Sequence, residues 1–134
     1  MPKAHLNPDS LFPSVQHGFS QIVKVRGGTT VFISGQTAWD AKKRLVGGVN
    51  LVEQTRQALR NVRIAVEEAG GDLTDVVSLR IYVVNYKRED AGPIGELFRE
   101  FFPGKHPPAS TWIGVSSLAV EDFLIEIEAI AVVE

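Results

Sequence analysis

Val76-Val77-Ser78-Leu79-Arg80-Ile81-Tyr82-Val83-Val84 is predicted to be a β-strand with two unlike faces. It is rich in β-branched residues, and its apolar residues alternate with others at the period of a strand. The alternation places Val77, Leu79, Ile81 and Val83 on one face, against a core. Ser78, Arg80 and Tyr82 share the other face, which mixes polarity with bulk as intersubunit faces often do. A homo-oligomer is therefore predicted, with a solvated outer face as the alternative.

One helix is predicted before this strand in the sequence and another after it. In the first helix, Asn50 is expected to be the N-cap, and Glu53 three residues later would complete a loose capping box. Gly70-Gly71 is expected to end the helix. The second helix spans about residues 93–102, with a proline in its first turn and a proline pair after its end. Residues at helical spacing mark the buried side of the first helix: Leu51, Thr55, Ala58, Leu59, Val62, Ala65, Val66 and Ala69.

The remaining extended segments are expected to pair as neighbours in the chain. Residues 21–26 and 29–34 flank the turn signal Gly27-Gly28, and residues 110–115 and 123–133 would close the chain as a C-terminal hairpin. Residues 40–44 are predicted to form a turn, followed by a short strand remnant at Leu45-Val46. Residues 1–14 carry three prolines and are expected to be an irregular arm.

This order of elements predicts an α+β fold. Two helices are too few to cover both faces of a sheet, so they should pack on one face of a mixed β-sheet. The 134 residues, 44% of them hydrophobic, suit a single domain over 1–134 with its own core.

Composition excludes several classes of function. The chain has no cysteine, so disulfides, cysteine-bound metal and thiol nucleophiles are excluded. A net charge of −2 without a basic stripe gives no footprint for nucleic acid. The N-terminal residues do not have the apolar core of a signal peptide, and no apolar run is long enough to span a membrane. A cytoplasmic location is expected.

Few side chains in the sequence are candidates for metal binding or acid/base catalysis. The three histidines lie in unrelated loops without metal-ligand spacing, so no metal site is predicted. Glu126 and Glu128 are two apart on a strand and share one face. On a solvated face they are ordinary charges. On a covered face at least one needs a basic partner or a shifted pKa, and Arg80 is the leading candidate partner.

Several motifs, taken together, resemble the Rid family (YjgF-like, endoribonuclease L-PSP-like, the reactive-intermediate deaminases). Each motif alone is weak, but the set lies in the family's order and spacing over most of the chain beyond the arm. The matching segments are Ser34-Gly35-Gln36, the helix 54–62 closing at Ala69-Gly70-Gly71, the strand 75–84, Pro108-Ala109-Ser110, and Ile125-Glu126-Ile127-Glu128-Ala129-Ile130-Ala131.

The resemblance implies a chorismate-mutase-like α+β fold and a homotrimer with three ligand clefts between subunits. Archetypal members hydrolyse enamines and imines released by amino-acid dehydratases, giving a 2-keto acid and ammonia. They use no metal or organic cofactor. An arginine after Pro-Ala binds the substrate carboxylate, a glutamate of the last strand orients water, and an aromatic residue near the N-terminus helps close the cleft.

Carried over by position, Glu126 matches the catalytic glutamate and Phe19 falls near the aromatic residue. Ser110 stands where the arginine is expected, and an alignment shifted by one residue puts Thr111 there. Neither hydroxyl replaces a bidentate, charge-assisted contact, so a standard 2-imino acid deaminase is not expected.

Three hypotheses follow, the last of them a chaperone-like or structural role that no sequence feature supports. In the first, a cleft enzyme hydrolyses an imine, an enamine or a related small metabolite. Glu126 activates water, Ser110 and Thr111 hold the ligand, and Phe19 and Trp112 wall the pocket, although a core role is the simpler interpretation of either aromatic residue. Arg80 is the replacement cation considered. In the second, a non-catalytic trimer binds a small metabolite or has a regulatory role.

Overall fold

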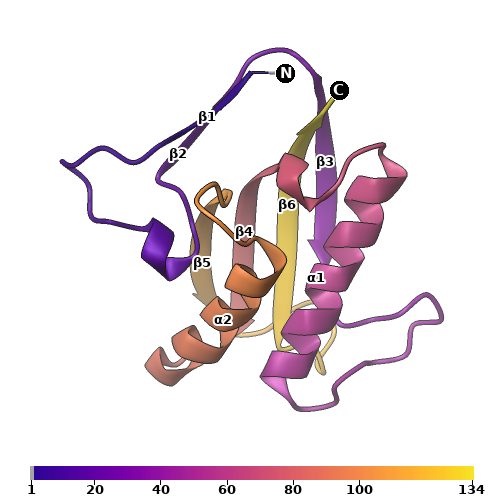
Figure 1. Ribbon diagram of the computed structural model, residues 1–134. Helices are drawn as coiled ribbons and strands as arrows, with labels where there is room; N and C mark the ends of the chain where they lie inside the picture. The colour runs from indigo at the N-terminus through magenta and orange to yellow at the C-terminus, as the bar shows by residue number, and fades with distance from the viewer. Residues whose placement is uncertain (1) are drawn as a thin grey trace.

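The computed structural model describes residues 2–134, whose centre is a four-stranded mixed sheet with strand order β3-β6-β4-β5. The strands are β3 (Thr29–Gln36), β4 (Val76–Val84), β5 (Ala109–Val115) and β6 (Ile125–Val133). β4 and β5 run parallel, and the other neighbours are antiparallel. The helices α1 (Leu51–Glu68) and α2 (Ala91–Phe101) lie on the same face of the sheet (Figure 1). The predicted α+β fold with both helices on one face is confirmed.

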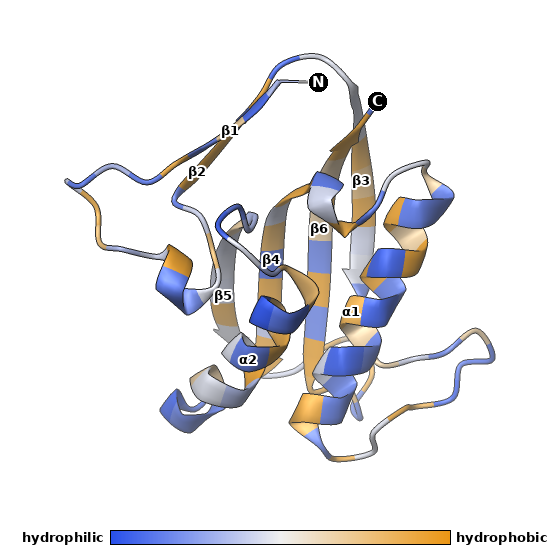
Figure 2. Cartoon of the chain, in the orientation of Figure 1, coloured by the Kyte–Doolittle hydropathy of each residue, from blue (hydrophilic) through white to orange (hydrophobic). Residues whose placement is uncertain are grey.

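The ends of α1 follow the signals in its sequence. The side chain of Asn50 accepts a hydrogen bond from the Glu53 backbone N–H at 3.1 Å, which satisfies one of the first unpaired donors of the helix. Gly70 has a φ of 93°, the left-handed conformation that glycine adopts most easily. Hydrophilic residues of α1 lie on its outer side, and hydrophobic bands turn toward the sheet (Figure 2).

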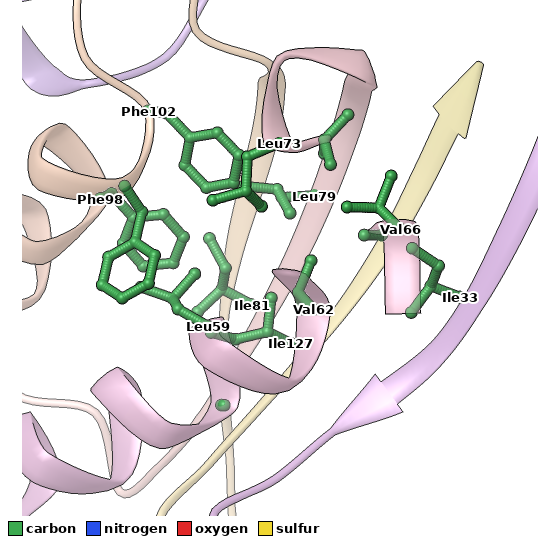
Figure 3. Packing of buried hydrophobic residues seen from close by; sticks show 14 of the residues in the cluster. Ile33, Leu59, Val62, Val66, Leu73, Leu79, Ile81, Phe98, Phe102 and Ile127 are labelled. Atoms are coloured by element: carbon green, nitrogen blue, oxygen red, sulfur yellow. The ribbon is translucent and has the colours of Figure 1, made fainter. Parts of the chain in front are cut away.

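The core lies between the helices and the sheet (Figure 3). Leu59 of α1, Ile81 of β4 and Ile127 of β6 are fully buried at 0% exposure, and Phe98 and Phe102 close the α2 side. Burying each such aliphatic side chain stabilises the fold by about 1.5–3 kcal/mol. Both central strands are therefore fixed against the helices, which sets the direction in which their other face points.

The predicted C-terminal hairpin is wrong. β5 follows α2, and a helical crossover returns the chain parallel to the strand before it, so β5 pairs with β4. Residues 116–124 then cross the end of β4, where the Val84 and Asn85 N–H groups donate to the Leu124 and Val115 carbonyls at 2.9 and 2.8 Å. β6 enters between β4 and β3, so β5 and β6 flank β4 without touching each other.

The N-terminal region also differs from the prediction. Gly27 and Gly28 do form a turn, both with positive φ, but β2 (Ile22–Val25) does not pair with β3. It pairs with β1 (Lys3–Leu6), inside the segment expected to be irregular. This two-stranded ribbon lies apart from β3, toward the β5 side of the molecule (Figure 1).

A β-bulge shifts the first residues of β4. The pairing with β6 slips between Val76 and Ser78, so Val76, at 2% exposure, takes the core position expected for Val77. From Ser78 onward the predicted alternation holds, with Leu79, Ile81 and Val83 in the core.

The sheet face away from the helices, called the open face below, is partly apolar. Phe32 of β3 is 78% exposed there, opposite Ile130 of β6. Hydrophilic bands interrupt β6 (Figure 2), where Glu126 and Glu128 lie. No helix within residues 2–134 is both long and apolar enough to cross a membrane.

Candidate functional site

A cavity of 450 Å³ opens between β5, α2 and the segment before β2, and we call it the Ser110 cavity. Aromatic walls with a few polar groups, at this volume, are typical of small-molecule sites. The residues that line it are His17, Phe19, Tyr86, Ala91, Gly92, Gly95, Arg99, Ser110 and Trp112.

Phe19 reaches this cavity because the chain around it is tied to the edge of β5. The buried Ser20 donates from its N–H to the Pro108 carbonyl at 3.0 Å and from its hydroxyl to the Pro107 carbonyl at 2.5 Å. The buried Ser14 hydroxyl donates to the Phe19 carbonyl at 2.7 Å. These bonds seat Phe19 at the cavity that Ser110 also lines, as the resemblance implied.

Trp112 serves both the core and the cavity. Its ring packs against Phe98 at 6.0 Å between centroids, and Tyr86 meets it edge-on at 6.2 Å. Trp112 therefore packs against the core and also lines the cavity. The indole is a rigid wall that the core holds in place.

Arg99 is the residue that sequence reasoning missed. Side chains on a helix lean toward its N-terminus, and Arg99 lies across Gly95, one turn earlier. A Cβ on Gly95 would lie 3.3 Å from a guanidinium nitrogen, and one on Gly18 would lie 3.4 Å from the Arg99 Cγ. The guanidinium has no hydrogen bond or ion pair within residues 2–134. The signal was available: Gly92, Gly95 and Arg99 are spaced to share one helix face.

Glu126 lies on the open face, at the end of β3. Its carboxylate extends over Gly35, where any Cβ would overlap it. The pairing of β3 with β6 is irregular between Ile33 and Gln36, so the glycine sits where the strand deviates. Glycine at position 35 therefore makes the room in which the half-buried Glu126 is held.

Arg80, the candidate partner for one of the two glutamates, lies beside Glu128 and not beside Glu126. On the β4–β6 register Arg80 stands opposite Glu128, whereas Glu126 faces Tyr82. The Tyr82 hydroxyl donates to the Glu128 carboxylate. This bond, with a smaller effect of burial, raises the pKa of the Tyr82 phenol above its ordinary value, and Arg80 opposes the rise. Glu126 is thus left free of this cluster.

The predicted site residues divide into two groups on opposite faces of the sheet. Ser110 stands opposite Leu79 of the core, and Thr111 stands opposite Arg80 of the open face. Phe19, Ser110 and Trp112 meet in the Ser110 cavity. Arg80, Thr111 and Glu126 belong to the open face, so Arg80 does not reach the Ser110 cavity of its own chain.

Comparison with known proteins gives the context for this arrangement. Residues 11–133 match the family described as Endoribonuclease L-PSP. The crystal structure of YyfB from Yersinia pestis, a protein of unknown function of the conserved Rid family, is 42% identical. It superposes with a TM-score of 0.95 over 99% of this chain and 100% of that one. The chain belongs to the Rid family.

Other Rid relatives are more distant. The Escherichia coli YjgF structure is 32% identical, with a TM-score of 0.69 over 81% of this chain and 84% of that one. A Dermatophagoides farinae protein named 2-iminobutanoate/2-iminopropanoate deaminase is 33% identical over 87% of this chain and 86% of its own.

The Rid-like helix motif has a structural role here. Gln54 is fully buried, and its amide donates to the Gly48 and Asp122 carbonyls at 2.7 and 2.9 Å while accepting from the Leu124 N–H at 2.9 Å. Asn61 donates to two carbonyls of the 37–39 segment at 2.9 and 2.8 Å. Gln54 therefore ties α1 to the loop that enters β6, directly before Glu126.

Proposed function

We propose that the protein hydrolyses a small imine or enamine that binds in the Ser110 cavity. The observation that carries the proposal is that this cavity joins Phe19, Ser110 and Trp112 to the unpaired guanidinium of Arg99. Similarity to a relative named 2-iminobutanoate/2-iminopropanoate deaminase supports the reaction class.

The proposed catalytic site needs a second copy of the chain. Glu126 lies on the open face and the Ser110 cavity lies on the helix face, so one chain cannot present both to one ligand. We propose a homotrimer in which the open face of one copy covers the cavity of the next. The exposed Phe32 and the 250 Å³ hollow that Arg80, Glu128 and Ile130 help to line are features that such an interface would cover.

In this cleft Glu126 acts as the general base. The substrate reacts as the protonated imine: the Glu126 carboxylate takes a proton from water as the water oxygen adds to the C=N carbon, and the C=N electron pair passes to nitrogen, giving a neutral carbinolamine. The Glu126 carboxylic acid then donates that proton to the amine nitrogen. As the C–N bond breaks, the carboxylate takes the hydroxyl proton and passes it to ammonia, so that ammonium and a carbonyl compound are released.

Arg99 changes the substrate expected from sequence. Ser110 cannot bind a carboxylate as an arginine does, so the sequence did not predict a standard 2-imino acid deaminase, and Arg80 was the replacement cation considered. A guanidinium in the same cavity supplies a planar pair of donors from α2 instead of β5. A carboxylate-bearing imine is therefore the substrate that fits, with Ser110 as a further hydrogen-bonding group.

The alternative function is ligand binding without turnover. The observation that favours it is that Glu126 points away from the cavity of its own chain. Such a protein would retain ligand affinity without Glu126, which separates the two functions experimentally.

Replacing Arg99 by Gln is expected to impair hydrolysis of carboxylated imines selectively. Loss of a charge-assisted hydrogen bond at a solvent-accessible site is worth about 1.5–3 kcal/mol, or about 10–150-fold in kcat/KM. The measurement compares an imine formed in the assay from an amino acid with the imine of the matching amino-acid amide. The neutral imine should be hydrolysed at nearly the same rate by both proteins.

Arg60→Gln is the matched control, because Arg60 is an exposed arginine on α1 away from the cavity. Its rates should equal those of the wild type. If Arg99→Gln lowered kcat/KM equally for both imines, Arg99 would not be the group that binds the substrate carboxylate. No hydrolysis above buffer by the wild type would contradict the enzymatic proposal itself.

Replacing Phe32 by Asp is expected to dissociate the assembly. A carboxylate at this position would be buried without a partner in the proposed interface, yet the side chain is 78% exposed in one chain, so folding is spared. Light scattering after size exclusion should give three chain masses for the wild type and one for the variant. Ile64→Asp, at another exposed apolar position but on α1, should remain trimeric. If Ile64→Asp were a monomer and Phe32→Asp remained a trimer, the interface would not be the open face.

A further inference from the structure

A second cavity, of 650 Å³, shares no residue with the Ser110 cavity, and we call it the His5 cavity. Three parts of the chain enclose it: β1 of the N-terminal ribbon, the turn that enters β4, and the end of α2 with the loop that follows. Its floor is apolar, made of Leu73, Val76, Phe101 and Phe102, all of them buried. The proposed hydrolysis does not use this cavity.

The rim of the His5 cavity is basic. Lys3, His5, Lys105 and His106 all line it, and no carboxylate does. Asp72 lies near Lys3, whose ammonium donates to the Thr74 carbonyl, so this lysine is already partly compensated. The other three have no hydrogen bond or ion pair within residues 2–134. The His5 and His106 side of the rim therefore carries the charge of Lys105 and two imidazoles whose ring nitrogens have no partner within the described residues.

The two histidines lie close together, with ring centroids 4.8 Å apart and planes tilted by 40°. Burial, followed by the positive charges of His106 and Lys3, lowers the pKa of His5, so the empty cavity disfavours the doubly protonated pair. An anion between the rings would reverse this, because it accepts a hydrogen bond from each imidazolium. Two imidazoles whose protonated forms repel each other in the empty cavity are well placed to share one anion.

We propose that the His5 cavity binds a small organic anion. A carboxylate or phosphate group would lie between His5 and His106, within reach of Lys105. A short apolar body would lie on Leu73 and Phe102. The ligand would bridge β1 to the loop after α2, and this site is independent of the imine hydrolysis proposed for the Ser110 cavity.

Binding at this site should depend on pH through His5. Because the pKa of His5 is already lowered in the empty cavity, lowering the pH toward about 5.5 favours its protonated, anion-binding form, and raising the pH to about 8 removes that form. Lys3, Lys105 and Asp72 are the other charged groups near the two rings, and hydrogen bonds from Thr74 hold the pKa of Asp72 below its ordinary value. Affinity for the anion should therefore fall by about tenfold or more between these two pH values.

The test is a titration of the ¹⁵N-labelled Arg99→Gln protein with benzoate, followed by amide shifts, at both pH values. Arg99→Gln weakens binding in the Ser110 cavity, so shifts at residues 3–5, 73–76 and 104–106 report the His5 cavity. We expect saturable shifts there, weakened at least about tenfold by His106→Gln and severalfold by Lys105→Gln. Both residues are exposed, so the fold should be retained, as unchanged amide shifts of α1 and β6 would show.

Two further probes define the ligand. Benzamide, the neutral counterpart of benzoate, should not saturate the site. Inorganic phosphate, tested alone, separates recognition of the charged group from recognition of the apolar body. Benzoate binding with weak phosphate binding indicates an organic acid, and the reverse indicates a phosphate ester. The proposal is overturned if neither anion gives saturable shifts at these residues, or if His106→Gln and Lys105→Gln leave the shifts unchanged.

Discussion

Glu126→Gln is expected to reduce imine hydrolysis by about 10²–10⁴-fold, the usual contribution of a positioned general base. The amide keeps the size of the side chain, so it should still fit over Gly35, but it cannot accept the proton from water. The effect should fall on kcat, because Glu126 is not part of the cavity that binds the ligand in one chain. Steady-state rates and ligand affinity measured on the same samples test this directly.

Glu128→Gln is the matched control on the same strand and face. It weakens the bond from the Tyr82 hydroxyl but leaves Glu126 in place, so turnover should change by less than about tenfold. Gly35→Ala gives an independent check, since a Cβ there displaces the Glu126 carboxylate without removing it. It should lose turnover as Glu126→Gln does. Full activity in both variants would assign the protein to ligand binding alone.

Local signals in the sequence predicted local structure well. Asn50 and Gly70 mark the ends of α1, and the alternation along 78–83 gives the correct faces of β4. Pairing between distant strands was harder, because a turn signal says only that the chain bends. Gly27-Gly28 bends the chain but separates β2 from β3, and β5 finds its partner through the crossover of α2.

The candidate site was predicted in part for the same reason. Family position correctly brought Phe19 and Ser110 together, although they are far apart in sequence. Strand alternation alone would have separated Ser110 from Thr111, since adjacent residues point to opposite faces. Arg99 was missed because it lies on a helix whose apolar residues drew attention to the core.

Gln54→Ala is expected to lower the free energy of unfolding by about 2–5 kcal/mol, because it empties a fully buried position and removes three hydrogen bonds, to the Gly48 and Asp122 carbonyls and from the Leu124 N–H. Urea unfolding at a fixed chain concentration measures the change, since assembly would add a concentration-dependent contribution. Gln57→Ala, one turn or less along the same helix, removes a single bond to Asn61 and should lose less than about 1 kcal/mol.

Gln54→Met separates hydrogen bonding from packing, because methionine has nearly the same length and fills the buried space without a donor. Gln54→Met should therefore recover little of the free energy of unfolding that Gln54→Ala loses. The Leu124 N–H that Gln54 binds lies two residues before Glu126, so the entry to β6 should loosen as well. Turnover should then fall more than affinity for a ligand in the Ser110 cavity. If Gln54→Met were as stable and as active as the wild type, the buried amide would not be what holds the strand that carries Glu126.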